Sequence, residues 1–179
     1  MIDAVLKLLE KLTQLAKHKK EVEEKTFDLL IKPLYTDLET IHLDYLKMFE
    51  KYQRELEEGT ELEKIAWQLE FDRLDLEPLR SSIRPFVESY EDNPKLNAYI
   101  KFFSSVVKYL HCVPGRESWS SSLISILNEI NNSSLSDQEI ESFREEVSKF
   151  LLLTLKWLRK NWAKISTEYA KLLAKVATS

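Results

Sequence analysis

The scarcity of glycine and proline is the feature of this sequence that most limits how the chain can fold. Only two glycines and five prolines occur among its 179 residues. Glycine readily adopts positive φ, and proline removes a helical hydrogen bond, so few positions favour a tight turn or a helix break. Folds that are rich in strands and turns need many such positions. The sequence therefore predicts an all-α fold.

Two long helical patterns lie at opposite ends of the chain. The first ends near Glu58 and repeats apolar residues at steps of three and four. The second begins after Ser136 and reaches Ala177 without a glycine or a proline, and Ser136 with Glu139 matches a capping box. Such steps place side chains on one face of a helix. We expect two long helices that pack antiparallel to each other.

Shorter helical patterns fill the middle of the chain. Thr60 can cap one helix, and Asp92-Asn93-Pro94 indicates a turn before a second. A third is expected over residues 118–130. Together with the long helices they predict a bundle of four to six helices, in a single domain over residues 1–179.

The break between the first two helices stays open within a window from Lys19 to Pro33. Pro33 fits the first turn of a helix, which Thr26 could cap, and it equally fits a kink within a longer helix. Sequence alone does not separate these two alternatives.

Large aromatic residues on the predicted apolar faces are expected to form the core. A chain of this length buries roughly 70% of its unfolded surface, so one core is sufficient. The expected core residues are Phe27, Tyr45, Phe49, Trp67, Phe71, Phe102, Phe103, Phe150, Trp162 and Tyr169.

Cysteine content and hydropathy bear on the compartment. The single cysteine, Cys112, cannot form an intramolecular disulfide, and no hydrophobic signal region follows Met1. No apolar stretch approaches the ~18 residues that a membrane-spanning helix requires. We expect a cytoplasmic protein.

Charge is distributed unevenly along the chain. The net charge is −4, yet residues 149–179 contain seven basic residues and one acid, Glu168. In this segment Trp157 and Trp162 alternate with Lys156, Lys160 and other basic residues. Because the whole chain is acidic, a nucleic-acid partner is disfavoured.

Three interpretations of this basic and aromatic helix compete. Leu152, Leu153 and Trp157 make it apolar nearly all round at mid-length, which is typical of a helix covered on every side at the centre of a bundle. Alternatively, the helix binds another protein or a second copy of the chain. A third possibility is that it lies on an anionic membrane surface. The candidate partner-binding residues are Leu153, Lys156, Trp157, Lys160 and Lys164.

One pair of residues has the spacing of a metal site. Glu39 and His42 form a Glu-x-x-His motif, which places a carboxylate and an imidazole on one helix face, as in di-metal helical bundles. A site of that kind needs a second such motif, and neither His18 nor His111 follows a glutamate at this spacing. The competing interpretation is that His42 borders the core.

Other catalytic patterns are missing from the sequence. Adjacent residues on a helix point about 100° apart, so His111 and Cys112 do not form a nucleophile pair. No glycine-rich phosphate loop surrounds Gly59 or Gly115. We therefore expect no cofactor and a non-catalytic protein-interaction or regulatory module that binds through its long helices. A membrane-surface protein and a metal-dependent bundle enzyme centred on Glu39 and His42 are the alternatives.

Overall fold

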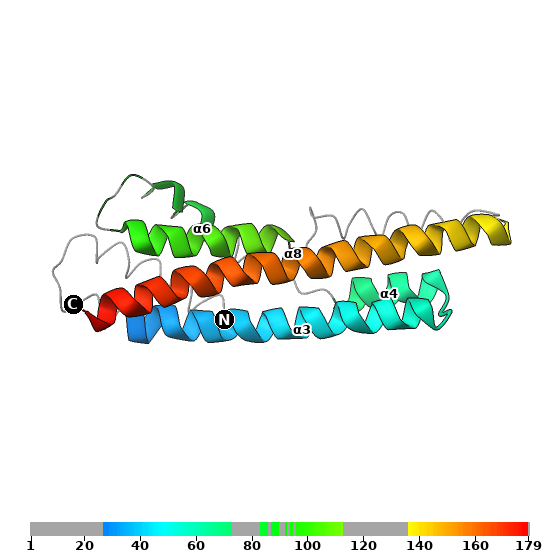
Figure 1. The fold of residues 1–179 in the computed structure, drawn as a ribbon, viewed down its shortest axis with the longest axis horizontal. Helices are drawn as coiled ribbons and strands as arrows, with labels where there is room; N and C mark the ends of the chain where they lie inside the picture. Colours follow the sequence, from blue (N-terminus) through cyan, green and yellow to red (C-terminus); the bar gives the residue numbers. More distant parts are fainter. Residues whose placement is uncertain are drawn as a thin grey trace.

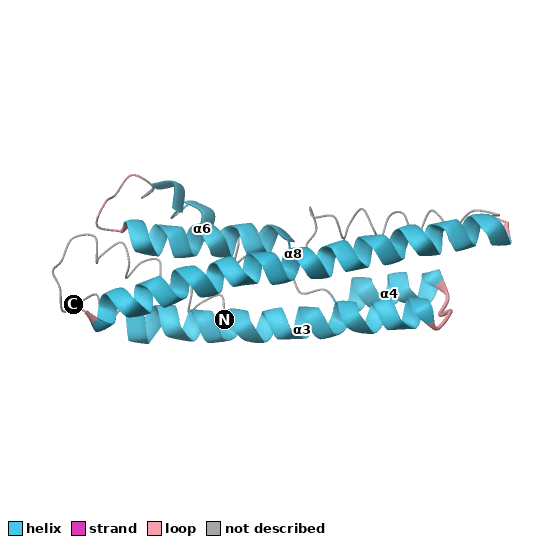
Figure 2. Cartoon of the chain, viewed as in Figure 1, coloured by secondary structure: helices cyan, strands magenta, loops and turns pink. Residues whose placement is uncertain are grey.

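Helices make up every regular element in the part of the chain that can be described (Figure 2). The computed structural model describes residues 27–72, 83–85, 87–89, 92, 94, 96–112 and 136–178, and these residues contain no strand. The all-α prediction is therefore confirmed. The elements are η1 (Phe27–Ile31), α3 (Lys32–Glu57), α4 (Leu62–Asp72), α6 (Asn97–Cys112) and α8 (Asp137–Ala177).

Helix α8 runs nearly the full length of the described structure and packs against both α3 and α6 (Figure 1). Near the end of α3, Gln53 Nε2 donates a hydrogen bond to Ser148 Oγ at 2.7 Å. Near its start, the Tyr35 hydroxyl lies 3.0 Å from Ser166 Oγ. Residue numbers rise along one helix as they fall along the other, so α3 and α8 are antiparallel, as the sequence predicts.

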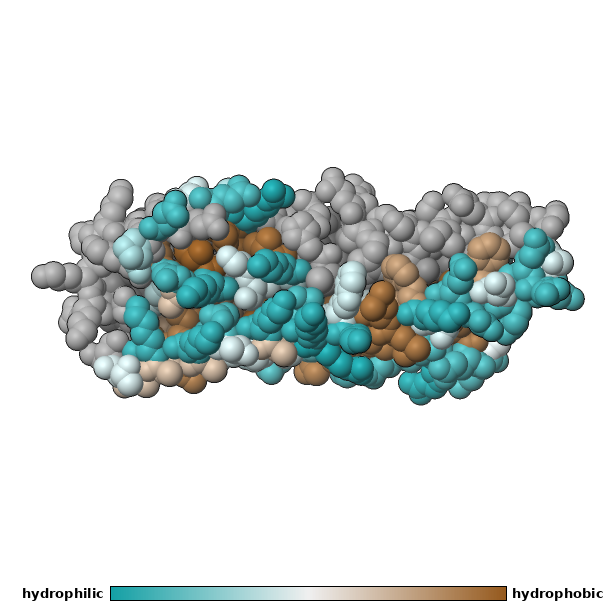
Figure 3. All heavy atoms as spheres, turned by 45° about the horizontal axis from the view of Figure 1, so that its top comes forward, coloured by the Kyte–Doolittle hydropathy of each residue, from teal (hydrophilic) through white to brown (hydrophobic). Residues whose placement is uncertain are grey.

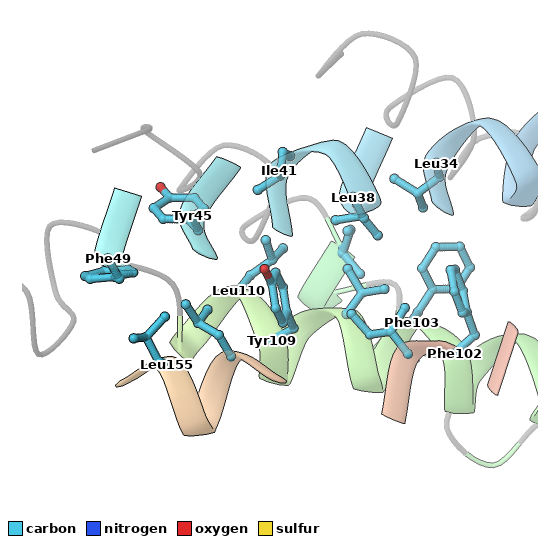
Figure 4. Close-up of a cluster of buried hydrophobic side chains, with 14 of the residues drawn as sticks. Leu34, Leu38, Ile41, Tyr45, Phe49, Phe102, Phe103, Tyr109, Leu110 and Leu155 are labelled. Carbon is cyan, nitrogen blue, oxygen red and sulfur yellow. The ribbon is translucent and has the colours of Figure 1, made fainter. Parts of the chain in front are cut away.

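Helix α6 also lies antiparallel to α8. The rings of Phe102 and Tyr169 are in contact, with centroids 6.5 Å apart, and the rings of Tyr109 and Trp162 are in contact, with centroids 6.1 Å apart. Residue numbers again rise along one helix as they fall along the other. The buried side chains of α3 and α6 point toward one another and toward α8 (Figure 4). The largest fully buried side chains include Tyr45, Tyr52, Tyr109, Phe49, Phe102 and Phe103.

The ends of the two long helices are closed by local hydrogen bonds. Ser136 Oγ accepts from the Glu139 amide, and a Glu139 carboxylate oxygen accepts from the Ser136 amide at 2.9 Å, which completes the predicted capping box. At the end of α3, Gly59 has a φ of +84°, and the Thr60 amide donates to the Glu55 carbonyl at 2.9 Å. This bond, with that from the Gly59 amide to Leu56, forms a Schellman motif.

Pro33 lies inside a continuous helical segment. The π-helical turn η1 leads directly into α3, and Ile31 between them has helical φ and ψ of −71° and −45°. A wider π turn accommodates a residue that cannot donate the usual hydrogen bond. Pro33 thus lies in the first turn of α3, as the first alternative predicts, while η1 continues the helical backbone before it, as the second predicts. Thr26, the start of the predicted first helix and the helix predicted over 118–130 lie outside the described residues.

Most of the predicted aromatic core is confirmed, with one clear error. Phe150, Trp162 and Tyr169 are partly buried against the core, and the Phe71 side chain lies outside the described part. Trp67 was expected in the core, but its side chain is 68% exposed. Helix α4 buries Leu62, Ile65 and Leu69 at helical spacing, which turns Trp67 to the opposite face. The buried members of the predicted set are Phe27, Tyr45, Phe49, Phe102 and Phe103.

Candidate functional site

All five predicted partner-binding residues lie on the outward face of α8. Leu153, Lys156, Trp157, Lys160 and Lys164 are each exposed. The inward face of the same helix fixes this orientation, because its buried residues recur at helical spacing and pack against α3 and α6. The buried residues of α8 are Val147, Leu151, Thr154, Leu155, Leu158, Ile165 and Leu172.

Apolar side chains form the middle of this outward face. Leu152, Leu153 and Trp157 are 52%, 45% and 46% exposed. Figure 3 shows apolar side chains among hydrophilic ones near the middle of the face that it draws. The interpretation that α8 is covered on every side at mid-length is therefore wrong. The bundle covers α8 from the side of α3 and α6 and leaves these three side chains about half accessible to solvent.

The charges along α8 divide into paired and unpaired groups. Lys149 Nζ lies 3.4 Å from Glu145 Oε2, and Lys171 Nζ lies 2.6 Å from Glu168 Oε1. Between these pairs, residues 150–167 contain no acidic residue. The lysines of this interval, Lys156, Lys160 and Lys164, form no ion pair with any described residue.

Arg159 is the one basic residue of this interval that is neutralised. Its Nη2 donates to Glu50 Oε1 on α3 at 2.7 Å. Sequence reasoning missed this pair, because nothing in the local sequence joins residues 109 positions apart. Within residues 150–167, the cationic charge without an ion-pair partner in the described structure is therefore that of the three lysines, which lie around Leu153 and Trp157. These five residues, together with Leu152, are called the α8 patch below.

A column of stacked rings supports α8 from the side of the bundle. Tyr169 stacks on Tyr35 with centroids 3.9 Å apart, and Tyr35 stacks on Trp162 at 5.2 Å. Trp162 then stacks on His42 at 4.8 Å. Aromatic pairs of this kind add about 0.5–1.5 kcal/mol each beyond their burial, so they fix α8 against α3. The backbone that carries the α8 patch is thus held in place.

His42 is a structural residue of this column. Its Nδ1 atom shares a hydrogen bond of 3.0 Å with the Tyr109 hydroxyl. Burial, with a smaller contribution from the positive charge of Arg159, lowers the pKa of His42 to about 4. The imidazole is therefore neutral near pH 7. This is the arrangement expected of a histidine at the edge of the core.

Glu39 and His42 do not gather further metal ligands in the described structure. Glu39 is exposed while His42 is buried. Within the described ranges, no three residues among histidine, cysteine, aspartate and glutamate lie close enough to hold one ion. The Glu-x-x-His spacing is therefore accounted for by helix geometry and by the role of His42 in packing. The side chains of His111 and Cys112 lie outside the description.

Comparisons with protein-family models, with curated proteins and with solved structures found no match. No described helix has the length and apolar character needed to cross a membrane. The chemistry of the α8 patch is therefore the basis for any statement about function.

Proposed function

We propose that this chain is a non-catalytic protein-interaction module that binds an acidic surface of another protein through the α8 patch. The observation that carries this proposal is a set of three lysines that have no ion-pair partner among the described residues. They lie around exposed Leu152, Leu153 and Trp157, in an interval of α8 without acids. The single cysteine supports a cytoplasmic location as part of the same proposal.

The composition of the α8 patch resembles that of protein interfaces. Interfaces combine an apolar centre with a polar rim, and tryptophan is among the residues that most often dominate binding energy. Trp157 is well suited as such an anchor, since burying its remaining exposed surface removes apolar area from water. The three lysines increase the rate of encounter with a negatively charged partner.

A protein partner is favoured over a lipid surface by how α8 uses its apolar residues. A helix that binds in the headgroup layer turns its wide apolar face toward the acyl chains, and its affinity scales with the apolar area buried. In α8 the wide apolar face packs in the bundle core. The exposed remainder is small and is bordered by Lys156 and Lys160, which suits a discrete docking site better than insertion.

Quantitative partner capture tests the proposal. The bait is the full chain, compared with a Trp157→Ala/Lys160→Glu variant in an extract of cells that produce the protein. A matched control, Trp67→Ala/Lys47→Glu, removes an exposed tryptophan and reverses an exposed lysine outside the patch. We expect at least one acidic protein to be retained by the wild type and the control but lost from the patch variant.

Two outcomes contradict the proposal. If the patch variant retains every protein that the wild type retains, the patch has no role in binding. If the wild type instead sediments with vesicles rich in anionic lipid, and the patch variant does not, the membrane alternative replaces it. Zwitterionic vesicles serve as the control for nonspecific adsorption.

A further inference from the structure

We infer that the segment recognised by the α8 patch is an acidic amphipathic helix of at least three turns, laid along α8. This inference rests on the proposed function and specifies the partner more narrowly. It follows from how the patch side chains are spaced, because they lie in two parallel rows and not in a compact cluster.

The first row consists of Leu152, Lys156, Lys160 and Lys164, which follow one another at intervals of four residues. Side chains at this interval form a ridge along a helix, and the grooves beside such a ridge accept the ridge of a second helix. At 1.5 Å per residue the row extends over roughly 18 Å. An occupant that contacts all four side chains must itself extend over about three helical turns.

The second row lies beside the first and is shorter. Lys149, Leu153 and Trp157 continue at the same interval, and Lys149 is already paired with Glu145. The part of this row without an ion pair, Leu153 and Trp157, is therefore apolar, while the first row is mainly cationic. The complementary surface has carboxylates one turn apart in one row and apolar side chains in the adjacent row. An amphipathic helix with an acidic flank presents that arrangement.

The backbone beneath the patch suits such an occupant. Leu151, Leu155 and Leu158 are buried between α8 and the rest of the core. The Arg159–Glu50 ion pair and the Trp162 ring stack join the same stretch of α8 to α3. A rigid ridge imposes its register on a docking helix and loses little conformational freedom on binding.

A second copy of the chain is a poorer occupant of the patch. Two α8 patches that faced each other would bring six lysines together, and like charges in contact oppose association. The same argument excludes a basic peptide. The occupant we infer is therefore a separate segment with the opposite charge.

A designed peptide tests the inference directly. It is a helix-forming peptide of about 20 residues, long enough to sample the helix when free, with glutamates one turn apart beside a row of leucines. The control peptide has the same composition with the two rows scrambled. We expect the designed peptide to bind the full chain at least tenfold more tightly than the control, and to gain helical circular dichroism on binding.

An exchange of charges between the chain and the peptide tests whether the lysines of the first row contact the carboxylates of the peptide. Lys160→Glu is expected to lower the affinity for the designed peptide at least tenfold. Replacing the central glutamate of the peptide with lysine is expected to restore most of that affinity. Lys47→Glu on α3 is the matched control and should leave binding unchanged. Equal affinity for the scrambled peptide, or no rescue by the exchange, overturns the inference.

The result also separates this inference from the proposed function. If partner capture depends on the patch but the designed peptide binds no better than the scrambled one, the partner is acidic without being a docked helix. If neither partner capture nor peptide binding depends on the patch, and the chain self-associates through the patch in a concentration-dependent manner, a second copy is the occupant. Stronger binding to anionic vesicles than to the peptide favours lipid headgroups instead.

Discussion

The Nδ1 atom of His42 on α3 and the hydroxyl of Tyr109 on α6 are 3.0 Å apart and share a buried hydrogen bond. The imidazole ring also stacks on Trp162 of α8. One histidine on α3 thus contacts both α6 and α8 inside the core. This bond gives the hydroxyl of a fully buried tyrosine a polar partner inside the core.

This relationship makes stability depend on pH. The pKa of His42 is lowered from 6.5 to about 4 by burial first and by Arg159 second. Between these values the unfolded chain binds a proton that the folded chain does not. The contribution of His42 to stability is therefore complete above about pH 6.5 and falls as the pH approaches 4, by about 3 kcal/mol in all. Urea unfolding at several pH values measures this change.

Two variants identify the source of the pH dependence. His42→Gln keeps a side chain that can hydrogen-bond to Tyr109 but does not titrate, so its unfolding free energy should fall less between pH 6.5 and 4. Tyr109→Phe removes the hydroxyl and should lower stability by about 1 kcal/mol at neutral pH while the histidine still titrates. Parallel pH profiles for the wild type and His42→Gln would show that other groups cause the loss.

Gly59 is a second position where a single substitution is expected to lower stability. Its φ of +84° closes α3, and a Cβ at this position meets no atom within 4 Å. The effect of Gly59→Ala is therefore conformational and not steric. We expect a loss of about 1 kcal/mol, because a left-handed backbone is unfavourable for a residue with a Cβ. Thermal unfolding should show a smaller loss for Gly59→Asn, and equal melting temperatures for all three proteins would contradict this account.

Trp67 and Phe103 should respond oppositely to truncation, although both were expected in the core. Phe103 is fully buried, so Phe103→Ala is expected to destabilise the fold by about 3–5 kcal/mol. Trp67 is largely exposed, so Trp67→Ala should change stability by less than about 0.5 kcal/mol. Chemical denaturation of the two variants provides the comparison. A large loss for Trp67→Ala would mean that this ring is covered in solution.

The long helices could be predicted from sequence because the signals that define them are local. Scarce glycine and proline, the apolar period and the Ser136 capping box all act within a few residues of one another. Their antiparallel packing and the burial of Phe49 and Phe103 follow from the same apolar faces. The π turn before Pro33 is less predictable, because one sequence is compatible with both a helix start and a kink.

The exposed or buried state of individual side chains could be predicted less well. Trp67 and Leu153 lie on helices that are apolar over much of their circumference, and which side is covered depends on where the neighbouring helices lie. The charge of Arg159 is neutralised by a residue on another helix, so local charge counts overestimate the cationic surface. The five candidate binding residues were identified from sequence. Their exposure on the outward face of α8 and the neutralisation of Arg159 beside them required the structure.

Lys160 offers a test in which stability and binding change in opposite directions. Lys160 lies one turn from both Lys156 and Lys164 on an exposed face, and none of the three has an ion-pair partner among the described residues. Like charges at this spacing are slightly unfavourable, whereas a glutamate four residues before a lysine is favourable. Lys160→Glu should therefore raise the unfolding free energy by a few tenths of a kcal/mol.

The same substitution should weaken binding of the designed acidic peptide at least tenfold. A lysine kept for folding alone would lower stability when replaced, and its loss of binding would follow from unfolding. A variant that is at least as stable as the wild type yet binds the peptide at least tenfold more weakly shows that Lys160 acts at the interface. Parallel chemical denaturation and titration with the designed peptide measure both quantities. If Lys160→Glu is destabilised by more than about 1 kcal/mol, a large effect for a surface site, the lysine row serves the fold and the case for the α8 patch is lost.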